Sequence, residues 1–202
     1  MKRQILILLP VLALFSCTPM DSDDKENVVD NDVWVDLGLS VLWAKYNIGA
    51  TSPEEYGGYY AWGETEGKGT YTAENYLFKK IDDEKFSISG TSNDVARVKW
   101  GGDSRMPESD EIEELCSLCL WEDHILNGVN GSLVTGQNGN SIFIPDAGLR
   151  YNENRMPFVI FWSATSYNVA NARSLPVVTP DGMKRSYWER AYGLPVRAVK
   201  DK

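Results

Sequence analysis

The sequence predicts an α+β domain, and three features support that class. One amphipathic helix is expected over residues 107–121, several short apolar runs have the pattern of strands, and long Gly-, Pro- and Tyr-rich stretches separate them. The chain has 202 residues, of which 43% are hydrophobic, so it can bury one core or at most two small ones. One helix, short strands and long loops are typical of an α+β domain.

The early part of the chain favours short strands and loops. Residues 33–37 alternate apolar and polar side chains, and residues 41–44 form a second apolar run, so both are expected to be strands. Residues 48–72 are rich in Gly, Tyr, Pro and Trp, which favours long loops. One helical turn is expected at 94–99.

The helix over 107–121 has the clearest signals. Ser109 is expected to be its N-cap, and the acidic residues that follow suit the positive end of the helix dipole. Four residues recur at three- and four-residue spacing and predict one buried face: Ile112, Leu115, Cys116 and Cys119.

Turn signals and apolar runs predict the later strands. A hairpin is expected over 129–145, with its turn at Asn138-Gly139. The continuous apolar run at 158–162 is typical of a strand covered on both faces. Three more strands are expected, the first two joined by a turn at 180–182: residues 175–179, 184–188 and 194–199.

Charge and hydropathy argue against nucleic-acid binding and against a membrane-spanning helix. The formal net charge is −9, and a sequence pI near 4.7 argues against nucleic-acid binding, which needs clustered Lys and Arg. The longest apolar run, residues 5–15, contains Pro10 and is far shorter than the ~20 residues of a membrane-spanning helix.

The N-terminus has the pattern of an export signal. Lys2 and Arg3 precede the apolar run, and the four residues that end at Cys17 (LFSC) resemble a bacterial lipobox. That resemblance implies a lipoprotein signal peptide at 1–16 and a lipidated Cys17. Two or three acyl chains, palmitate among them, are sufficient for stable anchoring. The alternative is a plain signal peptide with an incidental cysteine.

The residues after Cys17 are expected to form a tether. Residues 17–32 comprise the lipidated cysteine and an acidic stretch almost without core residues, and 33–200 are expected to be the folded domain. An acidic stretch at this place resembles the surface-export signal of Bacteroidetes lipoproteins. It implies an outer-membrane location that faces the cell exterior, although a simple linker has the same composition.

Four segments, in a fixed order, carry a family resemblance. They are VDLGL (35–39) with LWA (42–44); NIGATSPEEYG (47–57) with YAWGE (60–64); WGGDSRMP (100–107); and GNSIFIP (139–145), followed by FWS (161–163) and PVR (195–197). Together they resemble the Fibrobacter succinogenes major paralogous domain of Bacteroidetes lipoproteins. This resemblance covers about residues 33–200. It implies a C-type lectin-like fold, similar to that of formylglycine-generating enzymes, with long loops and adjacent N- and C-terminal strands. It implies no activity, because the family has no common reaction.

Few residues suggest catalytic or metal chemistry. His124 is the single histidine, whereas zinc sites take three or four ligands. Cys116 and Cys119 have C-x-x-C spacing and three interpretations: core thiols, a disulfide, or a metal or redox pair. Their place late in an acidic helix favours core thiols. The 29 acidic residues offer many pairs for glycoside hydrolysis, and the sequence selects none. No catalytic residue, metal or cofactor is expected.

A binding site is expected to use loop aromatics. Amphipathic rings serve recognition and core packing equally well. The residues selected are Tyr59, Tyr151, Tyr167, Asn168 and Trp188. The function expected is a cell-surface lipoprotein that binds a glycan or another surface protein without catalysis. The alternative is a structural component of a surface assembly, such as a fimbrial tip or a polysaccharide-uptake complex. A hydrolase is third.

Overall fold

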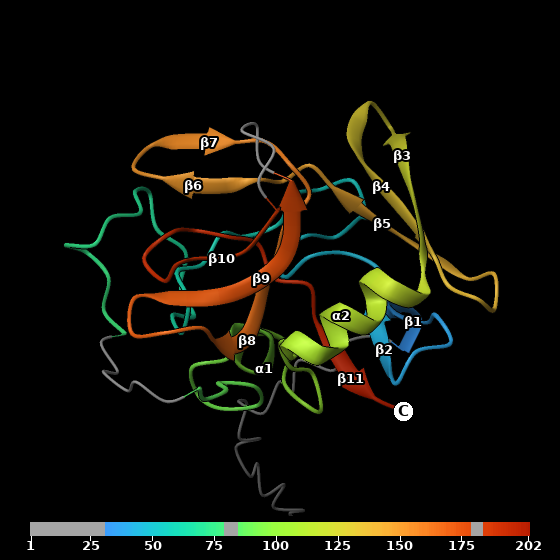
Figure 1. Ribbon diagram of the computed structural model, residues 1–202, viewed down its shortest axis with the longest axis horizontal. Helices are drawn as coiled ribbons and strands as arrows, with labels where there is room; N and C mark the ends of the chain where they lie inside the picture. Colours follow the sequence, from blue (N-terminus) through green and yellow to red (C-terminus); the bar gives the residue numbers. More distant parts are fainter. Residues whose placement is uncertain (1–30, 79–84, 179–183) are drawn as a thin grey trace, which may run out of the picture.

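The computed structural model describes residues 31–78, 85–178 and 184–202. The expectations for residues 1–30, lipidation of Cys17 included, and for the turn at 180–182 lie outside these ranges. Within them the chain is mostly β, with eleven strands in four small antiparallel sheets and two short helices (Figure 1). The predicted α+β class, with one main helix and a C-type lectin-like fold, is therefore wrong. The helix is shorter than expected, and segments expected to be loops pair as strands.

One small sheet brings together segments from opposite ends of the described chain. A 3₁₀ turn (Asn31–Val33) leads into β1 (Trp34–Asp36), which pairs with β2 (Val41–Ala44), and β11 (Val199–Asp201) pairs with the other edge of β2. The first and last strands therefore lie in one sheet. Both early strands occupy the predicted positions.

Both helices begin with a side-chain cap. Asp94 precedes α1 (Val95–Trp100) and accepts hydrogen bonds from the backbone N–H groups of Ala96 and Arg97, so the helical turn expected at 94–99 is confirmed. Helix α2 (Ser109–Leu118) has Glu108 as its N-cap, in a capping box with Glu111, and not Ser109 as predicted. It ends three residues early because Leu120 and Trp121 pair with β4 instead of continuing the helix.

The second sheet follows α2 directly. It contains β3 (Leu120–Leu126), β4 (Val129–Thr135) and β5 (Ser141–Pro145) in that order, and the predicted hairpin over 129–145 is confirmed. Strand β3 was not predicted. It joins β4 through Asn127-Gly128, whose φ angles of 49° and 83° give the left-handed turn that Asn-Gly favours.

The third sheet has the order β10-β9-β8, and a small hairpin lies beside it. Its strands are β8 (Trp162–Ser166), β9 (Asn171–Val178) and β10 (Lys184–Glu189), and the hairpin consists of β6 (Leu149–Tyr151) and β7 (Asn154–Met156). The strand predicted at 158–162 is wrong except for Trp162. The residues before Trp162 contribute to the core without forming a strand: Ile160 is buried in one apolar cluster and Phe161 in the other.

The strand predicted at 194–199 is also wrong except for Val199. Residues 190–199, here called the central segment, begin in a turn at 190–192, and residues 193–199 then pair with several other segments in the interior. For example, Leu194 pairs with Tyr60, and Val199 pairs with Arg105. No single neighbouring strand accompanies the central segment, so most of it does not belong to a sheet.

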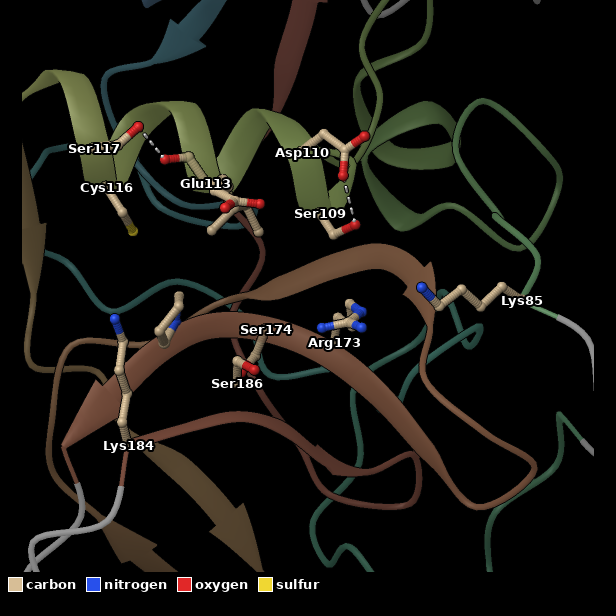
Figure 2. Close-up of a pocket in the computed structure, with 12 residues that line it drawn as sticks. Lys85, Ser109, Asp110, Glu113, Cys116, Ser117, Arg173, Ser174, Lys184 and Ser186 are labelled. Atoms are coloured by element: carbon tan, nitrogen blue, oxygen red, sulfur yellow. Dashed lines mark hydrogen bonds between the residues drawn. The ribbon is translucent and has the colours of Figure 1, made fainter.

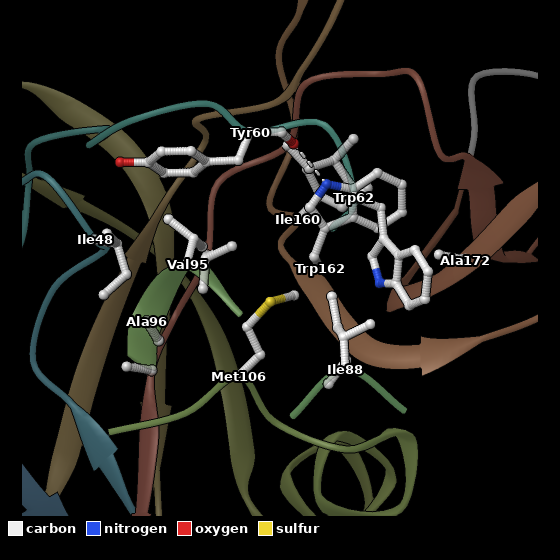
Figure 3. Close-up of a cluster of buried hydrophobic side chains, with 14 of the residues drawn as sticks. Ile48, Tyr60, Trp62, Ile88, Val95, Ala96, Met106, Ile160, Trp162 and Ala172 are labelled. Carbon is white, nitrogen blue, oxygen red and sulfur yellow. Dashed lines mark hydrogen bonds between the residues drawn. The ribbon is translucent and has the colours of Figure 1, made fainter. Parts of the chain in front are cut away.

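Two apolar clusters make up most of the core. The larger cluster contains Trp62, Trp162 and Met106 (Figure 3), and the smaller contains Trp43, Phe161 and the buried face of α2. The Trp62 and Trp162 rings are fully buried, and each indole N–H donates a 2.8 Å hydrogen bond to a backbone oxygen, that of Ser163 and that of Tyr60 respectively. Each indole is therefore held by both packing and a polar contact.

We expect Trp162→Ala to lower the free energy of unfolding by roughly 3–5 kcal/mol, because it opens a cavity and removes one of the two donors to the Tyr60 carbonyl, the other being the Leu194 N–H. Urea unfolding followed by circular dichroism measures this loss. Leu77→Ala is the matched control, since Leu77 is 78% exposed, and we expect a change below about 0.5 kcal/mol. Equal losses in the two variants would contradict the assignment of Trp162 to the core.

Candidate functional site

A groove with a volume of about 750 Å³ lies between α2 and the β9–β10 pair. Figure 2 shows the side chains of α2 on one wall and those of β9 and β10 on the other. We call this the α2–β9 groove. Its lining is mostly polar: Lys85, Ser109, Asp110, Ile112, Glu113, Cys116, Ser117, Arg173, Ser174, Pro176, Lys184 and Ser186.

The periodicity of each element partly determines which side chains reach the groove. Helix α2 buries Ile112 and Leu115, so its acidic and hydroxyl side chains remain on the other face. On the sheet, Ala172 and Trp188 are paired and buried, whereas the next pair, Arg173 and Tyr187, lies on the opposite face. Alternation alone does not give the lining of the groove, because Ser174, Lys184 and Ser186 also reach it. The register shift between Arg185 and Tyr187 interrupts the alternation, so the polar side chains on either side of it can face α2.

The two walls carry opposite charge. The α2 wall has Asp110 and Glu113, and the other wall has Lys85, Arg173 and Lys184. Within the described residues, none of these three cations forms an ion pair with a carboxylate. The groove thus keeps its positive and negative side chains apart and available to a ligand.

An aromatic pair extends the sheet wall. The rings of Tyr167 and Tyr187 stack with centroids 4.1 Å apart and an interplanar angle of 7°. Both side chains are partly exposed, at 38% and 37%, and the Arg173 guanidinium lies 5.1 Å from the centroid of the Tyr167 ring. Because Tyr187 is the cross-strand partner of Arg173, the stacked rings lie beside the groove.

The thiol of Cys116 faces the groove (Figure 2). Both Cys116 and Cys119 are free, Cys116 is exposed, and Cys119 is half-buried against the smaller core cluster. The interpretation of Cys116 as a core thiol is therefore wrong: it lies on the edge of the apolar face of α2. Removal of the sulfur from water nevertheless raises the pKa of Cys116 to about 11, an effect that nearby Lys184 opposes.

The α2–β9 groove continues toward β3 and β4. A second hollow of about 630 Å³ shares Cys116, Pro176 and Lys184 with it, and a third of about 540 Å³ shares Asp123, Ser132 and Val159 with the second. The third also contains His124 and Asp146. Burial raises the pKa of the Asp146 carboxyl, and the nearby charge of Asp123 adds to that effect. The three hollows therefore adjoin one another along this face.

The residues selected from the sequence are not gathered in one place. Tyr59 is buried, and its hydroxyl donates to the backbone oxygen of Ala147. Trp188 is buried in the larger core cluster, where its ring stacks on Phe158. These two residues therefore belong to the core and do not line the groove.

The other three selected residues lie nearer the surface. Tyr151 is exposed on β6, in contact with the Tyr192 ring. The side-chain oxygen of Asn168 accepts from the backbone N–H groups of Ala170 and Asn171, so its role is to form the turn before β9. Only Tyr167 lies next to the groove.

Sequence reasoning missed the basic residues of the groove. Lys85, Arg173 and Lys184 come from separate segments, and no local motif links them. Alternation along the expected strand at 184–188 separates Tyr187 from the buried Trp188, but it also places Lys184 on the side of Trp188, because it does not reveal the register shift between Arg185 and Tyr187. The three basic residues lie opposite α2 only because of the tertiary fold, which the local sequence does not reveal.

Comparisons with family models, with curated proteins and with solved structures find no match for this chain. The described residues contain no group of three or more His, Cys, Asp and Glu side chains arranged to hold a metal ion. Neither helix in the described ranges has the length and apolar character needed to cross a bilayer. The geometry of the groove is therefore the main basis for a function.

We expect the Cys116 thiol to alkylate slowly at neutral pH. With a pKa of about 11, far less of it is thiolate at pH 7.5 than of an ordinary cysteine, so iodoacetamide should react at least roughly tenfold more slowly than with free cysteine. The measurement uses residues 25–202 with Cys119→Ser, which leaves Cys116 as the single thiol. The rate should rise up to about pH 11, and Lys184→Gln should lower it further. A plateau below pH 9 would contradict the raised pKa.

Proposed function

We propose that this protein is a lipid-anchored cell-surface module that binds a glycan in the α2–β9 groove and catalyses no reaction. The single observation that carries the binding role is an open polar groove bordered by a stacked tyrosine pair. The lipobox-like LFSC at 14–17 and the acidic stretch after it support the anchor and its outward orientation. Membership of the paralogous-domain family is part of the same proposal and is supported by the order of its sequence motifs.

The chemistry of the groove suits a sugar chain. Serine hydroxyls, carboxylates and cations from both walls can exchange hydrogen bonds with sugar hydroxyls: Ser109, Ser117, Ser186, Asp110, Glu113 and Arg173. The exposed edges and faces of Tyr167 and Tyr187 offer apolar surface to the C–H groups of a pyranose ring. Because the groove continues into two further hollows, it can hold several linked sugars.

A structural role in a surface assembly is a second candidate, and one observation favours it. Strand β3 is an edge strand of its sheet and exposes Leu120 at 59% and Ile125 at 65%. An exposed edge with apolar side chains is a template for strand addition from another chain. Recovery of stable stoichiometric complexes, together with no glycan binding, would favour this second candidate.

We expect residues 25–202 to bind specific members of a glycan array, and Tyr187→Ala to weaken that binding roughly tenfold, about 1.4 kcal/mol, because a stacking surface is lost. Calorimetry with the best array ligand measures the affinity. Tyr151→Ala is the matched control, since Tyr151 is exposed on a different hairpin, and we expect no change. Absence of binding to every glycan would contradict the proposal.

We expect cells that express the full chain to incorporate labelled palmitate into it, and Cys17→Ala to abolish the label, because the LFSC sequence directs acylation of that thiol. Gel fluorography of the purified protein measures incorporation. Cys119→Ser is the control and should keep the label. A labelled Cys17→Ala protein would show that the anchor is assigned to the wrong residue.

A further inference from the structure

We propose that the α2–β9 groove selects acidic glycans, with Arg173 as the residue that binds a sugar carboxylate and with Lys85 and Lys184 on either side of it. This inference rests on the proposed glycan-binding function and names the class of glycan. The observation behind it is that three cations line the groove and form no ion pair with a described carboxylate, in a chain with a formal net charge of −9: Arg173 on β9, Lys184 on β10 and Lys85 on a loop at one end (Figure 2).

The described basic side chains differ in their partners: some form ion pairs, whereas others, such as Arg97, Arg155 and Lys200, form none with a described carboxylate. The groove differs from these isolated positions because three cations of the second kind line it together. Elsewhere in the described residues, five basic side chains form ion pairs within the protein: Lys45 with Asp32, Lys68 with Glu64, Lys99 with Glu66, Lys202 with Asp36, and Arg105 with Glu111 and Asp201. Acidic partners are therefore plentiful in this chain. Arg173 and Lys184 nevertheless stand opposite Asp110 and Glu113 across open space without pairing to them (Figure 2).

Arg173 has the better chemistry for a carboxylate. A guanidinium presents two parallel N–H donors that match the two oxygens of a carboxylate, whereas an ammonium acts as a point charge. The Tyr167 ring lies 5.1 Å from the Arg173 guanidinium and limits its freedom, so less entropy is lost on binding. The stacked Tyr187 lies beside it to receive the ring that bears the carboxylate.

The opposite wall sets the orientation of the sugar chain. Asp110 and Glu113 repel an anionic group and accept hydrogen bonds from hydroxyls. A bound chain therefore directs its carboxylates toward β9 and β10 and its hydroxyls toward α2. A glycan in which acidic sugars alternate with neutral sugars fits this arrangement better than one with charge on every sugar. An acidic peptide also carries carboxylates, but it lacks the hydroxyl-rich edge that faces α2.

The test is calorimetry of the full-length chain in detergent with a hyaluronan hexasaccharide, in which uronate alternates with a neutral sugar. The matched ligand is the same hexasaccharide with its carboxylates reduced to primary alcohols. We expect the reduced ligand to bind at least tenfold more weakly. We expect Arg173→Gln to weaken binding of the acidic ligand at least tenfold and Arg173→Lys to restore part of the loss.

Two further variants separate the site from general charge. Arg97→Gln removes the same charge from an exposed position on α1, outside the groove, and should leave binding unchanged. Glu113→Gln removes a repulsive carboxylate from an exposed position on α2 and should strengthen binding of the acidic ligand severalfold. A gain of affinity cannot arise from misfolding, so this variant tests the orientation directly.

The outcomes distinguish this inference from the proposed function. Equal binding of both hexasaccharides, or binding of neutral array glycans alone, would overturn acidic selectivity and leave glycan binding standing. Binding of a poly-glutamate peptide without binding of either sugar, or no binding of any glycan on an array, would overturn both. Binding of another acidic oligosaccharide that depends on Arg173 would support the inference.

Discussion

The burial of the central segment, residues 190–199, is the constraint on which the rest of the structure depends. Buried peptide groups must find hydrogen-bond partners, and no single strand runs beside this segment to supply them. Its partners come instead from distant segments. Gly193 exchanges bonds with Arg150, Leu194 with Tyr60, and Val199 with Arg105, while Pro195, Val196 and Ala198 accept from Trp162, Ile48 and Ala44. Each bond fixes a different part of the chain, so small sheets that would be marginal alone are held around one common segment.

Two buried arginines of the central segment extend this arrangement, and one of them holds the turn that precedes β9. The fully buried guanidinium of Arg197 donates to the backbone oxygens of Ala44 and Phe143, which links two sheets, and burial lowers its pKa to about 9. Arg190 donates to the backbone oxygen of Asn168 and, more weakly, to that of Asn171. Asn168 and Asn171 form the turn between β8 and β9, and this turn brings the Tyr167 ring within 5.1 Å of the Arg173 guanidinium on β9. The interior thus positions the binding side chains.

The sequence predicted the features that depend on neighbouring residues. The Asn138-Gly139 turn, the acidic start of α2 and the alternation of β1 were sufficient to place a hairpin, a helix and a strand. The failures at 158–161 and 194–198 have one cause: both segments are apolar and extended, but their partners lie elsewhere in the chain. The aromatic residues selected for binding failed for a related reason. Composition cannot separate a buried ring such as Trp188 on β10 from an exposed one such as Tyr167 in the turn after β8, because the tertiary fold decides which ring is covered.

The opposing walls of the groove reconcile the acidic chain with the acidic ligand that we propose. A net charge of −9 repels a polyanion at long range, but at physiological salt this repulsion is screened beyond about 8 Å. At contact, the charges that matter are those within the groove, and there Arg173, Lys85 and Lys184 face the ligand from one side. The overall negative charge therefore slows association with every acidic polymer, nucleic acid included. The groove favours binding of an acidic polymer whose carboxylates and hydroxyls match its two walls. Selectivity of this kind comes from the local separation of charges, which net charge does not reveal.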